Sequence, residues 1–405
     1  MNEILLITLS GEDHPGVTAG VTATLARHGV NVLDIGQAVI HATLSMGMLV
    51  EVPQDCDSEA VIAEVEDRAV QQGLKLRVSE VGSDSYAQWV DAQGRARYII
   101  TLLARKITAD QLARVTDVVS RHELNIDGIN RLSGRIPLGE LPALSKACVE
   151  FSVRGPLADS SVFRRDLLEV AGALEVDLAF QQDNMYRRNR RLVVFDMDST
   201  LIEAEVIDEL AARAGVGPQV SAITERAMGG ELDFSESFRA RVALLKGLDE
   251  SALQQVAAEL KITEGAQHLI ATLRTLGYKT AILSGGFTYF AHHLQRRLGM
   301  DYVYANELDI EDGVVTGRVT GTIVDGERKA LLLRQLAESE GIDLQQVIAV
   351  GDGANDLPML STAGLGIAFR AKPLVKQSAE QSISTLGLDA ILYLLGFSDR
   401  YQQPH

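Results

Sequence analysis

Apolar and polar positions alternate in the same order twice along the first half of the chain. In the first copy, the pattern predicts strands at 4–9, 31–40, 46–52 and 74–81, and helices at 17–28 and 59–71. In the second copy, it predicts strands at 98–103, 125–132, 147–153 and 175–180, and helices at 109–122 and 160–171. Each copy has the order β-α-β-β-α-β, which predicts two ferredoxin-like modules.

The second half of the chain has a different pattern. Short apolar runs without alternation occur at 192–195, 280–283 and 347–350, and helical stretches separate them. Such runs suit strands that are buried on both faces of a parallel sheet. We therefore expect an α/β domain with a Rossmann-like, doubly wound parallel sheet.

Two inserts interrupt this second pattern. The segment at about 203–262 is almost wholly helical and is long enough to form a lid over the sheet. The segment at 306–325 is expected to form a hairpin, because Asp312-Gly313 is a typical turn sequence between two strands.

The breaks between these patterns predict three domains. We place ferredoxin-like modules at 1–83 and 96–182 and the α/β domain at 190–400. Gly82-Ser83-Asp84-Ser85 is expected to link the two modules. The polar and basic stretch at 181–191 is expected to be a solvated linker between domains.

Composition excludes several classes of protein. The chain has 405 residues, of which 46% are hydrophobic and 23% charged, so it is neither disordered nor membrane-spanning. Its net charge of −17 disfavours a dedicated nucleic-acid binder, since the DNA or RNA backbone would be repelled. No signal peptide is seen at the N-terminus, and Cys56 and Cys148 lack metal-type spacing. We expect a reduced, cytoplasmic setting.

Candidate chemistry begins where the first buried run ends, at Asp196-Met197-Asp198-Ser199-Thr200. Ligands bind at the carboxyl ends of strands in open α/β sheets. Two carboxylates this close can share one site, where one attacks an electrophile and the other moves a proton, or where both face a cation. The alternative is a turn whose Asp and Ser side chains cap a helix.

Two further clusters follow the other buried runs. Ser284-Gly285-Gly286 offers backbone N–H groups and a hydroxyl to an anion, although a plain strand-to-helix turn has the same composition. Gly351-Asp352-Gly353-Ala354-Asn355-Asp356 places acids at a third strand end, where Asp352 can reach a divalent cation. A solvated loop is the alternative there.

Lys329 opens a predicted helix shortly before the third strand. A lone lysine at a helix start usually faces solvent. Together with the three strand-end clusters, however, it completes a set of carboxylates, anion donors and one cation around a single point. That set suits phosphoryl transfer, in which a carboxylate attacks in line while cations neutralise the phosphoryl oxygens.

These four motifs resemble the haloacid dehalogenase superfamily, and within it the phosphoserine phosphatases. The resemblance covers about residues 190–400 and implies hydrolysis of O-phospho-L-serine, the last step of serine biosynthesis. It implies that Asp196 is the nucleophile and that Asp198 is the general acid and base. It also implies Mg²⁺ as cofactor, held by Asp196, the Asp198 carbonyl and Asp352. The residues implied for phosphate binding or its support are Ser284, Gly285, Lys329, Asn355 and Asp356.

The resemblance extends to the lid. In the family, a Glu, a Met, a Phe and an Arg of the lid bind the substrate, and here these match Glu205, Met228, Phe234 and Arg241. An amino-acid substrate needs a carboxylate for its ammonium group and an arginine for its carboxylate. Arg239 competes with Arg241 by sequence position but lies elsewhere on the helix, and Met228 and Phe234 could instead belong to the lid core.

The repeated modules resemble paired ACT domains, which sense amino acids. Asp13, Gly16 and Asn31 of the first copy match the family's ligand-binding segment. The second copy departs from this pattern, with Ala104-Arg105-Lys106-Ile107-Thr108 and no Gly or Pro there, which leaves ligand binding by the second copy open. The resemblance implies serine as a regulator and a homodimer formed through these modules.

Two alternative functions stay open at this point. The enzyme could be a phosphatase or phosphotransferase for another small phosphate ester. The chain could also be an amino-acid sensor with a vestigial hydrolase domain, but four intact motifs argue against that.

Overall fold

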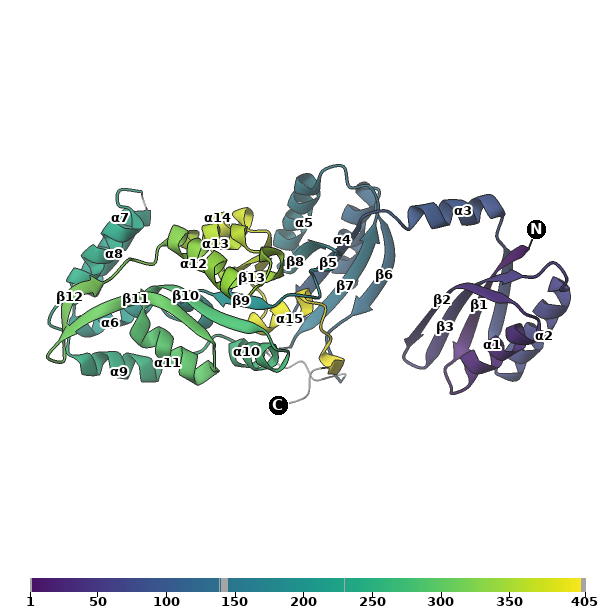
Figure 1. The fold of residues 1–405 in the computed structure, drawn as a ribbon, viewed down its shortest axis with the longest axis horizontal. Helices are drawn as coiled ribbons and strands as arrows, with labels where there is room; N and C mark the ends of the chain where they lie inside the picture. The colour runs from purple at the N-terminus through teal and green to yellow at the C-terminus, as the bar shows by residue number, and fades with distance from the viewer. Residues whose placement is uncertain (1, 138, 140–144, 229, 402–405) are drawn as a thin grey trace. The chain divides into compact units, whose positions relative to one another are not determined.

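The computed structural model describes residues 2–137, 139, 145–228 and 230–401 (Figure 1). The chain forms two compact units, Met1–Arg95 and Ala96–His405. No helix in the described ranges combines the length and the apolar character needed to cross a membrane.

The first unit is a four-stranded antiparallel sheet covered by two helices. Its strands lie in the order β2-β3-β1-β4. The elements are β1 (Glu3–Glu12), α1 (Val17–Arg27), β2 (Asn31–Ile40), β3 (Thr43–Val52), α2 (Ser58–Gln71) and β4 (Lys75–Glu80). The predicted ferredoxin-like order is confirmed. Residues 82–85, expected to link the two modules, lie between β4 and the first strand of the second module, and they open the helix α3 (Ser83–Ala92), with Asp84 in its first turn.

The second module repeats this architecture in the order β6-β7-β5-β8. Its elements are β5 (Arg97–Ala104), α4 (Ala109–Arg121), β6 (Asn125–Arg131), β7 (Ala147–Arg154), α5 (Ser160–Leu174) and β8 (Asp177–Gln182). The sequence predicted each of them to within a few residues.

The remaining part of the second unit contains a seven-stranded sheet in the order β12-β11-β10-β9-β13-β14-β15. All neighbouring strands are parallel except β11 and β12, which form the predicted hairpin around Asp312-Gly313. The strands are β9 (Leu192–Phe195), β10 (Lys279–Phe287), β11 (Tyr302–Glu311), β12 (Val314–Thr320), β13 (Val347–Gly351), β14 (Leu365–Phe369) and β15 (Gln381–Ile383).

Helices cover both faces of this sheet, as Figure 1 shows. Val193 and Phe195 pack on one face against α10 and α11, whereas Leu192 and Val194 pack on the other against α12 and α13. This burial on two faces explains the lack of alternation in β9. The helices are α10 (Ala266–Thr275), α11 (Thr288–Leu298), α12 (Gly326–Ser339), α13 (Leu357–Thr362), α14 (Pro373–Ser378) and α15 (Ile391–Leu394).

The insert between β9 and β10 forms the expected helical lid. Its helices are α6 (Val206–Ala214), α7 (Gly217–Met228), α8 (Phe234–Ala243) and α9 (Glu250–Glu259). Short turns complete the unit, namely η1 (Met197–Leu201), η2 (Leu344–Gln346), η3 (Ala354–Asp356), η4 (Leu388–Ala390) and η5 (Asp399–Tyr401).

The expectation of a solvated linker at 181–191 is wrong for its buried positions, among them two of its four arginines. Arg187 is 1% exposed and Arg190 is 7% exposed. Arg187 forms an ion pair with Glu150 of β7, and Arg190 donates to the carbonyl of Gln345. The segment crosses a packed junction between the second module and the α/β domain, where Arg187 and Arg190 are buried with partners, whereas Arg188 and Arg191 are exposed.

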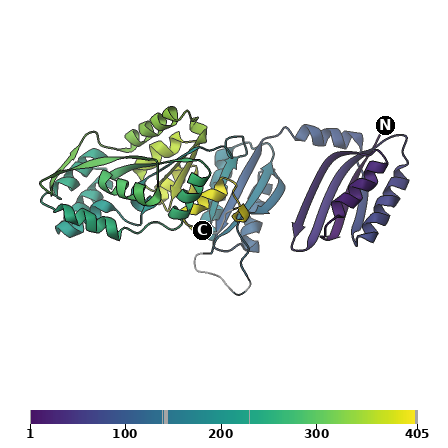
Figure 2. The same ribbon diagram turned by 60° about the horizontal axis from the view of Figure 1, so that its bottom comes forward.

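Side chains also join the edges of the two sheets at this junction. The Gln381 amide of β15 donates to the Phe180 carbonyl of β8 and accepts from the Phe180 N–H. Asp177 accepts from the backbone N–H groups of Ser384 and Thr385. In both views the C-terminal segment, drawn in yellow, lies beside β5–β8 (Figures 1 and 2). The second module and the α/β domain thus form one compact unit.

Candidate active site

Three of the sequence motifs meet because their strands are neighbours. In the sheet, β9 lies between β10 and β13 and is parallel to both. The carboxyl ends of these strands carry Asp196, Ser284 and Asp352 to one edge. Lys329 joins them from the first turn of α12 and is fully buried, so the expectation that an isolated lysine faces solvent does not hold for it.

Lys329 lies between two carboxylates. Its Nζ is 2.9 Å from Oδ1 of Asp196 and 2.7 Å from Oδ1 of Asp356. Asp196 Oδ1 also accepts the N–H of Met197 at 2.7 Å. The buried lysine therefore fixes the orientation of Asp196 at the end of β9.

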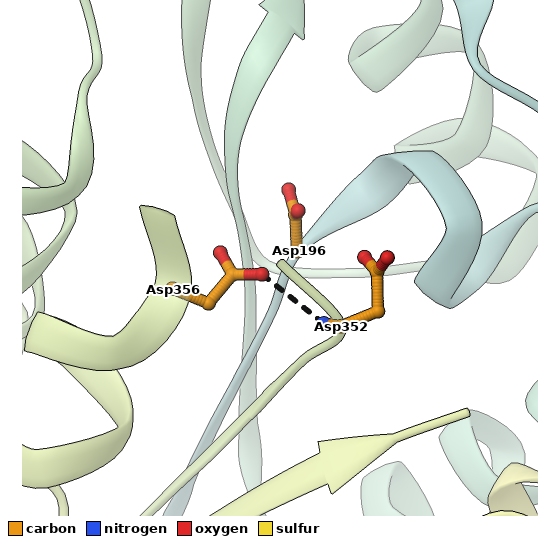
Figure 3. A group of neighbouring side chains, drawn as sticks. All are labelled: Asp196, Asp352 and Asp356. Carbon is orange, nitrogen blue, oxygen red and sulfur yellow. Dashed lines mark hydrogen bonds between the residues drawn. The ribbon is translucent and has the colours of Figure 1, made fainter. Parts of the chain in front are cut away.

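Asp196, Asp352 and Asp356 form an acidic cluster in which one carboxylate oxygen of each lies within 4.8 Å of the others (Figure 3). Asp356 is already engaged: its Oδ2 accepts the N–H groups of Asp352 at 3.1 Å and Gly353 at 2.9 Å. Within the described part of the chain, Oδ2 of Asp196 and Oδ2 of Asp352 accept no hydrogen bond. Two carboxylates with available oxygens are the donor set that a hard divalent cation prefers.

Burial and mutual repulsion shift the pKa values of these carboxyl groups. Burial, followed by the charge of Asp356, raises the pKa of Asp196 well above its usual range despite Lys329. Burial, then Asp356 and Glu205, raises the pKa of Asp352 to about 7. Burial lowers the pKa of Lys329, but Asp196 and Asp356 outweigh it and raise that pKa overall, so the ammonium stays charged.

Asp198 lies beside the acidic cluster, in the turn η1. Its Oδ1 accepts the N–H of Val206 at 3.3 Å, which ties it to the first turn of the lid. A Cβ added to Gly286 would come within 2.6 Å of Asp198 Oδ2, so a glycine is needed beneath this carboxylate. Burial, then Glu205 and Asp196, raises the pKa of Asp198 well above its usual range. A carboxyl that holds its proton can serve as an acid.

The Ser284-Gly285-Gly286 segment forms the last residues of β10, where the strand register shifts, and is not a separate turn. Ser284 is buried, and its Oγ accepts the N–H of Gly286 at 2.9 Å. Asn306 fixes the segment: its Nδ2 donates to the Gly285 carbonyl at 2.8 Å, and its Oδ1 accepts from Val324. Sequence reasoning missed Asn306, although it begins the predicted hairpin segment.

Two of the lid residues named from the sequence face the same site. Glu205 is the residue before α6, and its Oε1 accepts from Ser199 Oγ at 2.8 Å. Burial lowers the pKa of the Arg241 guanidinium, and the negative charges of Asp208, Glu205 and Asp198 raise it by a smaller amount. Arg241 is therefore close enough to these carboxyl groups to interact with them. Asp208, in the first turn of α6, was not identified from the sequence.

Other lid positions differ in what they contact. The Phe234 ring lies over Gly285, where an added Cβ would be 2.8 Å from the ring carbon Cζ. Arg239 is exposed, whereas Arg241 is half-buried. Met228 ends α7, and its side chain lies outside the described residues.

The remaining residues named from the sequence lie nearby or in the first unit. Asn355 belongs to η3, and its Oδ1 packs against Gly353. In the first unit, Asp13 donates its N–H to the Ala42 carbonyl at 2.8 Å, Gly16 has φ 97° before α1, and Asn31 donates to Glu51 at 3.1 Å.

Comparison with known proteins agrees with this geometry. Residues 193–361 match the family of haloacid dehalogenase-like hydrolases, and residues 3–79 match the ACT domain. The chain is 43% identical over 397 residues to a phosphoserine phosphatase of Streptomyces coelicolor, covering 97% of this chain and 92% of that one. It is 42% identical over 393 residues to the phosphoserine phosphatase SerB2 of Mycobacterium tuberculosis, with coverage of 97% and 93%.

A solved structure is also similar. The probable phosphoserine phosphatase from Vibrio cholerae, in unliganded form, superposes with a TM-score of 0.60 at 36% identity. The match covers 75% of this chain and 88% of that one.

Proposed function

The chain belongs to the phosphoserine phosphatases among the haloacid dehalogenase-like hydrolases, with an ACT domain at its N-terminus, and from this premise we propose that it hydrolyses O-phospho-L-serine to L-serine and phosphate. The observation that carries the proposal is the geometry at the end of β9, where Asp196 is paired with the buried Lys329 and a second carboxyl, Asp198, is oriented by the Val206 N–H.

Asp196 is proposed as the nucleophile. One of its oxygens attacks phosphorus, the bond from phosphorus to the serine oxygen breaks, and an aspartyl-phosphate forms. Asp198 gives its proton to the departing serine oxygen. It then takes a proton from the water that attacks the aspartyl-phosphate, which releases phosphate and restores both carboxyl groups. The raised pKa of Asp198 supports the first of these proton transfers.

Phosphate binding is assigned to Ser284, Gly285, Lys329 and Asn355, with Asp356 as the residue that positions Lys329. The 2.7 Å contact between Asp356 and Lys329 Nζ supports that last role. The end of β10 offers backbone N–H groups and a hydroxyl to phosphoryl oxygens, and Lys329 adds a positive charge where the substrate brings negative charge.

Mg²⁺ is proposed as the cofactor, because the available donors are oxygens. Asp196, the backbone carbonyl of Asp198 and Asp352 would hold it, since Asp356 is engaged by Lys329 and two N–H groups. When bound, this ion neutralises phosphoryl charge during the transfer.

The lid is proposed to recognise the amino-acid end of the substrate. Glu205 takes the ammonium group and Arg241 takes the carboxylate, while Phe234 and Met228 cover the substrate. The mutual electrostatic influence of Glu205 and Arg241 supports their placement around one small zwitterion.

The first ACT domain is proposed to bind serine through Asp13, Gly16 and Asn31, and to pair with a second copy of the chain in a cytoplasmic homodimer. The second ferredoxin-like module is proposed as an ACT domain without that ligand. Serine should lower the turnover rate, which a titration at millimolar serine measures. Analytical ultracentrifugation measures the oligomeric state.

The test of the activity is phosphate release from O-phospho-L-serine with and without Mg²⁺. Asp196→Asn should lose turnover by about a thousandfold or more, because it removes the attacking oxygen. Glu327→Gln, an exposed acid on α12, is the matched control and should retain full activity. Undiminished turnover by Asp196→Asn would exclude Asp196 as the nucleophile.

A second measurement separates phosphoserine from other small phosphate esters. Arg241→Ala should reduce turnover of phosphoserine far more than turnover of an aryl phosphate, which has no carboxylate to bind. Equal losses on both substrates would favour a different phosphate ester as the natural substrate.

A further inference from the structure

The lid joins the catalytic domain through two linkers that lie side by side. Ile202 and Ile262 form an antiparallel bridge, the Glu203 N–H donates to the Lys261 carbonyl at 3.0 Å, and the Thr263 N–H donates to the Leu201 carbonyl at 3.0 Å. We call residues 201–205 and 260–264 the lid hinge. All four lid helices lie between these linkers, so any movement of the lid relative to the sheet has to bend them.

A row of charged side chains crosses the lid hinge. Both oxygens of Glu264 accept from Arg105, each at 2.9 Å, and Oε2 also accepts from Arg370 at 2.8 Å. Arg370 Nη1 lies 3.8 Å from Glu203 on the other linker. We call Arg105, Glu264, Arg370 and Glu203 the hinge ladder. The contact between Arg105 and Glu264 is bidentate, which is the strongest geometry for an arginine–carboxylate pair.

Arg105 enters this ladder from outside the catalytic domain. It follows β5 of the second module, and its position is fixed there because Ser145 Oγ donates to the Arg105 carbonyl at 2.9 Å. A second ion pair reinforces the contact: Lys146 Nζ lies 2.6 Å from Asp389. The Asp389 carboxylate packs on Gly265, where an added Cβ would come within 2.4 Å of Oδ1. The second module thus contacts Glu264 directly and the next residue, Gly265, through Asp389.

Arg370 has a backbone conformation that requires support. Its φ of 46° is uncommon for a residue with a side chain and is retained only where contacts hold it. Its guanidinium contacts one carboxylate on each linker, so the conformation places it across the lid hinge.

The lid hinge leads directly to the reacting groups. Glu205 lies two residues after Glu203, and the next residue, Val206, donates its N–H to Asp198 at 3.3 Å. A shift of the first linker therefore moves both the carboxylate assigned to the substrate ammonium and the hydrogen bond that orients the acid and base.

We propose that Arg105, Glu264 and Arg370 are positioning residues for the phosphatase reaction, through which the second ferredoxin-like module sets the position of the lid. The proposal rests on the proposed function, because it takes phosphoserine as the substrate that the lid binds. It gives the second module a mechanical role that needs no bound amino acid, in agreement with the absence of Gly and Pro from its segment 104–108.

The test compares two substrates in variants of the full chain. Arg105→Ala should lower kcat/KM for phosphoserine about tenfold, the size expected when contacts that couple two sites are removed. Hydrolysis of an aryl phosphate, which lacks the groups that the lid binds, should fall by a clearly smaller factor, since the variant affects it only through the hydrogen bond of Asp198 and not through the lid contacts. Arg105→Lys keeps the positive charge but cannot form the bidentate contact, so its kcat/KM for phosphoserine should lie between those of Arg105→Ala and the wild type.

Arg114→Ala is the matched control, because Arg114 is also an ion-paired arginine of the second module but pairs with Asp110 on an exposed helix surface. It should leave both substrates unaffected. Glu264→Gln should lower kcat/KM for phosphoserine at least as much as Arg105→Ala, because it also weakens the contact with Arg370, and the double variant should lose no more than Glu264→Gln alone. If Arg105→Ala fails to fold, the comparison of the two substrates in Glu264→Gln still tests whether the ladder positions the lid.

Hydrogen exchange provides a readout that does not depend on turnover. Peptides covering 200–206 and 260–265 should exchange faster in Arg105→Ala and Glu264→Gln than in wild type or Arg114→Ala. Equal losses on both substrates, or unchanged exchange at the lid hinge, would overturn the proposal. A wild-type enzyme inactive on phosphoserine would instead overturn the proposed function, and hydrogen exchange would still test the ladder.

Discussion

Lys329→Met is the substitution that tests the electrostatics of the site most directly. Methionine retains most of the volume of the buried stem but removes the ammonium that lies 2.9 Å from Asp196 and 2.7 Å from Asp356. Removing one partner of a buried ion pair destabilises a protein by about 3–5 kcal/mol, because the other charge is left unpaired.

Proton uptake sets an upper limit to this penalty. One of the two carboxyl groups can bind a proton in place of the ammonium, and this costs about 1.4 kcal/mol for each pH unit above the ordinary carboxyl pKa, or roughly 4 kcal/mol at pH 7. We therefore expect the variant to be destabilised by about 3–4 kcal/mol at pH 7 and by about 1–2 kcal/mol at pH 5.

The sign of this pH dependence follows from the protons bound. The folded variant holds a proton that its unfolded chain has lost, so between about pH 4 and 7 its stability falls as pH rises. Urea unfolding followed by far-UV circular dichroism, without Mg²⁺, measures this. Fluorescence is unsuitable, because Trp89 lies in α3 of the other unit.

Lys261→Met, a substitution at an exposed lysine, is the control and should change stability by less than about 0.5 kcal/mol. If Lys329→Met costs less than about 1 kcal/mol at both pH values, the buried ammonium is not the charge that holds Asp196 and Asp356.

Three further predictions follow from the same geometry. Because burial and then the neighbouring carboxylates raise the pKa of Asp352 to about 7, protons compete with Mg²⁺ below that pH, and calorimetric titration should show weaker Mg²⁺ binding at pH 6 than at pH 8. Gly286→Ala should displace Asp198 and lower kcat about a hundredfold in the phosphate-release assay, whereas Gly36→Ala, where an added Cβ meets nothing within 4 Å, should have no effect. Glu150→Gln should leave the buried Arg187 unpaired and destabilise the catalytic unit by about 3 kcal/mol in the same unfolding assay.

The sequence predicted those parts of the fold that periodicity determines. Strands buried on two faces, such as β9, have uninterrupted apolar runs, and strands with one open face alternate, so both kinds of sheet could be recognised. The turn at Asp312-Gly313 was found because both residues adopt positive φ, which this pair favours.

The errors fall where tertiary contacts override local composition. Arginines in a polar stretch usually face solvent, and nothing near Arg187 in the sequence reveals that Glu150 of another module lies beside it. Asn306 was missed because its role is to accept and donate backbone hydrogen bonds between segments that are distant in the chain. Asp208 has a similar origin, since its influence on Arg241 depends on how α6 and α8 pack.

Charge balance links the metal, the substrate and the lid in one argument. The carboxyl groups of Asp196, Asp198, Asp352, Asp356 and Glu205 influence one another, and Lys329, Arg241 and Lys372 are among the cations that oppose them. A phosphate ester adds negative charge to a site that already has an excess of carboxylates. Burial and then this excess raise the pKa values of the carboxyl groups. The proposed Mg²⁺ site and a protonated Asp198 both reduce this excess, so each should favour phosphate binding, and by reciprocity the substrate should favour both. A lid that brings Arg241 toward the same carboxylates also reduces the excess of negative charge. The position of the lid hinge should therefore affect the turnover of phosphoserine more than the turnover of a substrate that the lid does not touch.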